Sequence, residues 1–121
     1  MQPETRAMIA ACAYAAVTGK SVTGLYDHAA AQDRDIAAEC RGNRIQAIDG
    51  DRSVTFGGTL PEIRNGADNT FVSLVVEGAR ASGYDRGSQG HYVADVSDRL
   101  IQLFDYNANA WFAYGTRNLG Q

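Results

Sequence analysis

Residues 81–105, ASGYDRGSQGHYVADVSDRLIQLFD, contain the pattern that decides the fold. Two strand-like runs in this stretch end in a large apolar residue followed by aspartate, first Tyr84 and Asp85, then Phe104 and Asp105. After each aspartate a few residues lead into a second apolar run. The same arrangement recurs about every 20 residues, which is a period typical of repeat architectures. The first runs are residues 23–27, 45–49, 81–85 and 101–105, and the second runs are residues 36–40, 54–57, 92–96 and 111–114.

A fifth, degraded copy fills the long gap between the second and third copies. It consists of residues 61–64 followed by residues 71–77, with Arg64 in the place of the aspartate. All the connections are short, so strands adjacent in the sequence are expected to be antiparallel neighbours in space. The predicted strands are residues 21–26, 35–40, 43–48, 53–57, 60–64, 70–77, 79–84, 90–96, 99–104 and 110–115.

The N-terminal segment has a different pattern, which predicts one α-helix over residues 3–18. Pro3 suits the first helical turn, Glu4 favours the positive end of the helix dipole, and Gly19 is a good terminator. The segment between them is rich in alanine and apolar nearly all round. A helix of this kind is expected to be buried on more than one side.

These features predict a mainly β, single-domain protein over residues 1–121. Its sheet is an antiparallel up-and-down meander of about 8–10 short strands built from hairpin repeats. A meander has two exposed edges unless it closes on itself, and the sequence lacks the lysines and prolines that protect an open edge. We therefore expect a small closed β-barrel. An open, strongly curled sheet around the helix is the alternative.

Successive side chains of a strand point to opposite faces of a sheet. The large residue before each aspartate directly follows a core-facing residue, so it is predicted to lie on the outer face. A strand that is apolar on both faces at its tip suggests that the outer face is partly covered, either by the helix or by a partner. The outward residues are Tyr26, Ile48, Tyr84 and Phe104.

Charge and composition limit the classes of partner. The net charge of −3 gives no electrostatic reason to bind nucleic acid or an anionic membrane, so neither is expected. The uncharged stretch at residues 7–17 is too short to span a bilayer, which takes about 20 apolar residues. The residues before it lack the net positive charge of a signal peptide, so a cytoplasmic location is expected.

Cys12 and Cys40 are interpreted as two small hydrophobic thiols. A disulfide between them would need Cα atoms within about 7 Å, and the sequence leaves that pairing open. No Cys/His spacing suits zinc. We predict no metal and no cofactor.

The repeated aspartates at positions 27, 49, 85 and 105 are the most specific signal. In a meander the loops that follow them emerge at one end, so the carboxylates should ring one rim. One interpretation is a shared site for a cation or a cationic ligand. The favoured interpretation is structural, because aspartate at a strand end bonds backbone N–H groups of the next turn.

Histidines and aromatic residues complete the candidate site. His28 follows Asp27 and His91 follows Asp85, so both could lie near the same rim, where a histidine can act as an acid or base. Alternate side chains on a strand face opposite ways, so Trp111, Phe112 and Tyr114 cannot all point inward. At least one large ring therefore lies outside the core, where aromatic residues often anchor binding. The alternative is that these rings pack against the helix.

Three functions are compatible with these patterns. The first is a non-enzymatic binding module that holds a small molecule, glycan or peptide at the Asp/aromatic loop rim. The second is a protein-interaction or structural subunit, such as a homodimer or a small inhibitor, that uses the apolar helix. A small barrel hydrolase or isomerase is the third, and no catalytic signature supports it. The predicted ligand-binding residues are Asp27, His28, Asp49, Asp85, Arg86, His91, Asp105, Tyr106 and Trp111.

Overall fold

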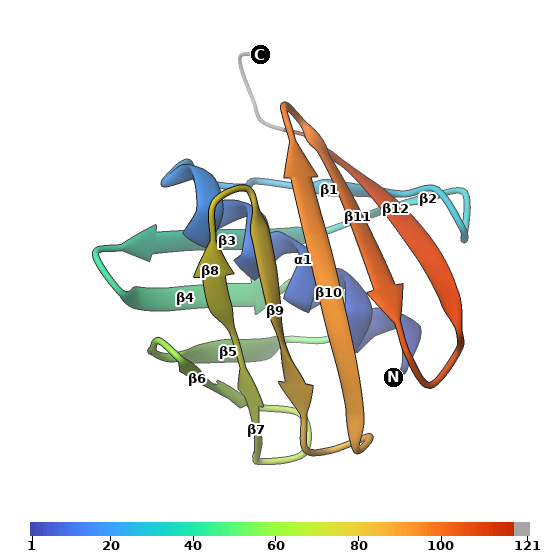
Figure 1. Cartoon of the computed structure of the whole chain (residues 1–121). Helices are drawn as coiled ribbons and strands as arrows, with labels where there is room; N and C mark the ends of the chain where they lie inside the picture. Colours follow the sequence, from blue (N-terminus) through green and yellow to red (C-terminus); the bar gives the residue numbers. More distant parts are fainter. Residues whose placement is uncertain (118–121) are drawn as a thin grey trace.

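The structure is a computed structural model that describes residues 1–117. Within this range one helix precedes twelve strands that form a single antiparallel sheet (Figure 1). The elements are α1 (Pro3–Thr18), β1 (Leu25–Asp27), β2 (Gln32–Arg34), β3 (Ile36–Arg41), β4 (Arg44–Asp49), β5 (Val54–Thr59), β6 (Glu62–Asn65), β7 (Thr70–Ser73), β8 (Val75–Glu77), β9 (Arg80–Asp85), β10 (Gly90–Ser97), β11 (Leu100–Asp105) and β12 (Ala110–Thr116).

The sheet curls until its two ends meet. Its order is β2-β1-β12-β11-β10-β9-β7-β6-β5-β4-β3, with β8 paired to β9 off this path. The strands at the two ends of the order, β2 and β3, are separated in the chain by Asp35 alone. Val22, just before β1, also bridges Ala38 of β3 through two backbone hydrogen bonds of 2.8 and 2.9 Å. The meander is therefore nearly closed into a barrel, as the repeat pattern predicts.

The helix occupies the interior of this barrel. It contacts β1, β3, β4, β8, β9, β10, β11 and β12, and residues 5–15 are all buried. Figure 1 shows α1 running behind β9 and β10, and the helix also contacts β3 and β4. The predicted bounds are confirmed, and Gly19 ends the helix in the left-handed conformation at φ 72° with its N–H bonded to the oxygen of Ala15.

Burial of the helix corrects one expectation from the sequence. The outward residues at the strand tips were predicted to be covered by the helix or by a partner, but the helix lies on the inner face. Small side chains explain why it fits there, because six of its sixteen residues are alanine. Alanine allows strands to approach a helix axis closely from several sides. The helix thus serves as the core of the barrel.

Five hairpins share one geometry. Their loops are residues 28–31, 50–53, 66–69, 86–89 and 106–109, each four residues long. The fourth residue of every loop has a positive φ between 53° and 60°, although none of them is glycine. Because the sheet is antiparallel throughout, β1, β4, β6, β9 and β11 point the same way and their loops gather at one end. The predicted common rim is therefore confirmed.

The structure departs from the sequence prediction in three places. Strand β2 was not predicted because Gln32, Asp33 and Arg34 are all polar. The predicted strand at residues 70–77 is divided into β7 and β8 by Leu74. In the fifth copy Asn65, and not Arg64, takes the aspartate place: Asn65 is 1% exposed and its Oδ1 accepts the Ala67 N–H at 2.8 Å.

Candidate functional site

The rim carboxylates are buried inside their own turns. Asp27, Asp49, Asp85 and Asp105 are each at most 3% exposed. In every case Oδ1 accepts a backbone N–H from two or three residues on, at 3.0–3.1 Å for the shortest bond. Asn65 makes the same bond with its amide oxygen. This contact satisfies a loop N–H that would otherwise be unpaired.

The second carboxylate oxygens also have partners. Oδ2 of Asp27 accepts from Arg34 Nε at 2.7 Å, and Oδ2 of Asp49 accepts from Arg52 Nε at 2.7 Å. Oδ2 of Asp85 accepts from the Ser88 hydroxyl at 2.7 Å. The described residues contain no group of three or more His, Cys, Asp or Glu side chains that could hold a metal ion. The four carboxylates have the geometry of turn formers.

Asp105 has the most cationic surroundings of the four. Its Oδ2 accepts hydrogen bonds from Arg6 Nη1 at 3.2 Å and from the Met1 nitrogen at 3.3 Å. Burial alone would raise the pKa of this carboxyl. The Ala108 N–H, the Met1 ammonium and Arg6 outweigh burial, so the pKa of Asp105 lies below its usual value. Asp105 is therefore ionised and fixes the first helical turn to the end of β11.

Five rings form a row on the outer face of β9–β12, which we call the aromatic strip: Tyr84, His91, Phe104, Tyr106 and Trp111. Tyr84 and His91 face each other across β9 and β10, with ring centroids 4.7 Å apart. Phe104 lies 5.2 Å from Trp111 and 4.8 Å from Tyr106. The Tyr106 N–H donates to the His91 oxygen at 3.2 Å, which joins the two groups. Tyr106 and Trp111 are each 54% exposed.

A depression of about 510 Å³ opens at one end of the strip. Its lining includes Tyr84, His91 and Tyr106, together with Ser82 and Gly83. Gly83 has no room for a side chain, because a Cβ there would be 2.6 Å from the carbonyl carbon of Ser73. The strip and this depression form one continuous surface, which is the candidate site.

The floor of the depression is held by a buried tyrosine. The Tyr92 hydroxyl donates to the Ser73 oxygen at 2.8 Å, and the Ser73 hydroxyl accepts the Tyr84 N–H at 2.9 Å. Burial raises the pKa of Tyr92 well above its usual value, so this hydroxyl stays a neutral donor. These bonds fix β7 against β9 beneath Tyr84.

The structure places the predicted site residues at four separate locations. His91, Tyr106 and Trp111 belong to the aromatic strip, while the four aspartates lie buried below the rim. His28 packs against Tyr26 on β1, with ring centroids 4.9 Å apart. Arg86 lies 3.6 Å from Glu62 and turns toward the β6–β7 hairpin. Among residues 1–117 neither histidine bonds to a carboxylate, so the structure contains no His–Asp pair for acid–base catalysis.

Sequence reasoning missed Tyr84 and Phe104 as site residues. The sequence does contain a signal for them. In a hairpin with a four-residue loop after the aspartate, the residue just before the aspartate lies opposite the residue seven positions later. Tyr84 thereby faces His91, and Phe104 faces Trp111. The same spacing pairs Tyr26 with Asp33 and Ile48 with Thr55 on the other hairpins.

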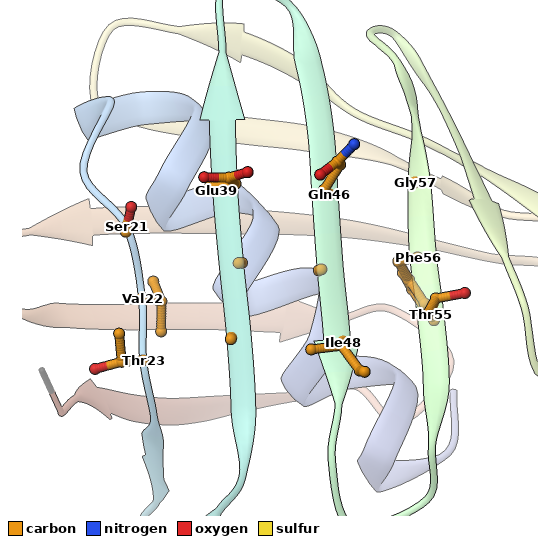
Figure 2. Close-up of a pocket in the computed structure, with 12 residues that line it drawn as sticks. Ser21, Val22, Thr23, Glu39, Gln46, Ile48, Thr55, Phe56 and Gly57 are labelled. Carbon is orange, nitrogen blue, oxygen red and sulfur yellow. The ribbon is translucent and has the colours of Figure 1, made fainter.

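A second depression, of about 610 Å³, lies on the outer face of β3, β4 and β5 (Figure 2). Small residues such as Ala37 and Gly57 form its floor. Figure 2 shows the side chains of Glu39, Gln46 and Ile48 standing above the strands around it. Ile48 is 45% exposed, and no predicted site residue lines this surface. Its lining has polar side chains but no exposed aromatic ring, because its one aromatic residue, Phe56, is buried.

No protein-family model matches the chain, and neither a curated protein nor a solved structure shows significant similarity to it. In the described part of the chain, no helix has both the length and the apolar character needed to cross a membrane.

Proposed function

We propose that this protein is a small binding module whose ligand lies on the aromatic strip and in the adjoining depression. The observation that carries the proposal is the row of five rings on one outer face, two of them more than half exposed. Exposed tyrosine and tryptophan side chains supply large contact areas and polar tips at little entropic cost, which is why binding surfaces are rich in them.

The scaffold supports this role. Four of the rings stand on four consecutive strands, and Tyr106 is the first residue of the β11–β12 turn, which the buried Asp105 fixes. A site on regular strands is held more rigidly than one on loops. Rigid rings lose little freedom on contact with a ligand, so a larger share of the contact energy appears as affinity.

A titration followed by two-dimensional ¹H–¹⁵N NMR would test the proposal. The probes are cellohexaose, chitohexaose, a ten-residue polyproline and a ten-residue Gly-Ser peptide, each added to the whole chain. We expect at least one probe to shift the signals of His91, Tyr106 and Trp111. Shifts confined to the β3–β5 face, or no shifts with any probe, would refute the assignment of the ligand to the strip.

A protein-interaction subunit is the second candidate, and a specific observation on β8 favours it. Val75 and Val76 are 48% and 36% exposed on a strand that pairs with β9 alone in the described chain. Exposed valines on an open strand edge favour pairing with another chain. The apolar helix, which the sequence predicted as the interaction surface, is buried in the barrel and cannot contact a partner. Strand β8 would be the interaction surface instead. Light scattering of the wild type and of Val76→Lys would detect a dimer that the lysine disrupts.

A further inference from the structure

We infer that the ligand of the aromatic strip is an uncharged proline-rich peptide in the polyproline II conformation. This inference rests on the proposed function, because it assigns a chemical class to the ligand of the same surface. Three features of the strip lead to it: the tilt of the rings, the polar groups that they carry and the charge of the surface.

The rings are tilted against one another and do not form a plane. Interplanar angles are 55° for Tyr84 and His91, 61° for Phe104 and Trp111, and 81° for Phe104 and Tyr106. A flat sugar ring stacks best on coplanar aromatic faces. Tilted rings instead form ridges with slots between them, and grooves lined by aromatic residues are the surfaces that recognise proline-rich segments.

The polar groups of the strip are suited to donate hydrogen bonds. The Trp111 indole N–H is a donor only, and the tyrosine hydroxyls and the imidazole can each donate as well. Within the described chain, the side chains of these four residues make no hydrogen bond to another protein group. They are Tyr84, His91, Tyr106 and Trp111. A polyproline II segment has no internal hydrogen bonds, so all its carbonyl oxygens are available as acceptors, and proline has no N–H to satisfy.

Ionised and amide acceptors are missing from the same surface. No carboxylate or amide side chain lines the depression, so its side-chain acceptors are limited to hydroxyl groups and the imidazole. The Asp95 carboxylate, on the outer face of β10, already accepts two hydrogen bonds from Arg80, at 2.6 and 3.1 Å. The lining of the depression contains no Asp, Glu, Lys or Arg, so it offers no charge complement to an acidic or basic peptide.

Calorimetric titration of the whole chain with the ten-residue polyproline tests the inference, with the Gly-Ser peptide and cellohexaose as controls. Calorimetry is needed because Trp111 is the single tryptophan and Trp111→Ala would abolish a fluorescence readout. We expect polyproline to bind at least about tenfold more tightly than either control, since its preformed helix loses less entropy.

Variants then assign the binding to the strip. Trp111→Ala and Tyr106→Ala should each weaken polyproline binding by about tenfold or more, as truncation of a central ring does. Phe71→Ala is the matched control, because Phe71 is 40% exposed on β7 outside the strip. Its affinity should equal that of the wild type, and circular dichroism should show all three variants folded.

The outcomes separate this inference from the proposed function. If cellohexaose binds and its binding is lost in Trp111→Ala while polyproline does not bind, the peptide class is wrong and the binding module stands. If none of the probes binds, both fail. Equal weakening in Phe71→Ala would place the peptide elsewhere and overturn the inference.

Discussion

Arg6 in the first half of the helix donates a hydrogen bond of 3.2 Å from Nη1 to Oδ2 of Asp105, at the end of β11. The same guanidinium lies 3.7 Å from the centroid of the Phe112 ring. The Asp105 side chain is fully buried and that of Arg6 is 11% exposed. Removing one partner of a buried ion pair leaves an uncompensated charge, so this contact should matter far more than an ion pair on the surface.

Arg6→Met tests whether the buried Arg6–Asp105 pair stabilises the fold more than an ion pair on the surface does. The substitution removes the guanidinium and leaves the Met1 ammonium as the cationic partner of the Asp105 carboxylate, so we expect a loss of about 1.5–3 kcal/mol in the free energy of unfolding, the range for a hydrogen bond to a charged group. Urea denaturation followed by circular dichroism measures it. Arg117→Met is the control, because the Arg117–Asp33 pair is 60% and 64% exposed and should contribute little. Similar losses in the two variants would contradict the argument.

The lowered pKa of Asp105 predicts how stability depends on pH. The folded-state pKa is below the unfolded value of about 3.9, so the stabilisation is fully present above that pH. It is lost as the pH falls through the folded pKa. Asp105→Asn lacks this contribution, so wild type and variant should differ most near neutral pH and converge below about pH 4. Urea denaturation between pH 3 and 7 measures the gap, and a gap that stays constant would count against this assignment.

Asp85 allows the role of the rim carboxylates to be tested. Its Oδ1 accepts the Gly87 N–H at 3.1 Å, and an asparagine can keep this bond, as Asn65 does at the equivalent place. Asp85→Asn should therefore be nearly neutral. Asp85→Ala also loses the bond from Ser88 and should cost on the order of 1–2 kcal/mol. Thermal unfolding with and without calcium measures both, and a calcium-dependent rise lost in both variants would indicate a shared cation site instead.

Local patterns in the sequence account for the helix and most of the hairpins. Pro3 and Gly19 mark the helix because their backbone preferences match its two ends. The hairpins are recognisable because aspartate at a strand end serves the turn that follows it. Strand β2 escaped prediction because its residues are all polar, although it pairs with β1 across a four-residue turn and Arg34 bonds to Asp27 at 2.7 Å in the same hairpin. A polar run without apolar alternation has no strand signature of its own.

The aromatic strip could be predicted only in part. His91, Tyr106 and Trp111 stand out as aromatic residues near repeat aspartates, but their grouping depends on the register of three neighbouring strands. Register follows from loop length, and the β9–β10 and β11–β12 hairpins share a four-residue loop after their aspartates. In the fifth copy, alignment on Arg64, one residue before Asn65, exchanges the outward and inward residues of that copy.

The two thiols should react very differently. Burial, reinforced by the charge of Cys40, raises the pKa of Cys12 to about 12, and burial also raises the pKa of Cys40. The thiolate is the reactive form, so at about pH 8 Ellman's reagent should modify Cys40 slowly and leave Cys12 intact in the native protein. In Cys40→Ser we expect Ellman's reagent to give no absorbance change until guanidinium chloride unfolds the chain and exposes Cys12. Native reactivity in that variant would show that Cys12 is accessible.

Gly83 beneath the aromatic strip should tolerate no side chain. A Cβ at this position would lie 2.6 Å from the carbonyl carbon of Ser73, and this contact is with backbone, which cannot move aside easily. Gly83→Ala should therefore cost about 3 kcal/mol or more through overpacking and should break the bonds that join β7 to β9. Gly57 is the matched control on β5, because a Cβ there meets its nearest atom, the Ile45 oxygen, at an ordinary 3.5 Å. Gly57→Ala should unfold at the wild-type urea concentration, while Gly83→Ala should unfold much earlier. Equal midpoints would mean that β7 and β9 are not in the close contact on which the depression depends.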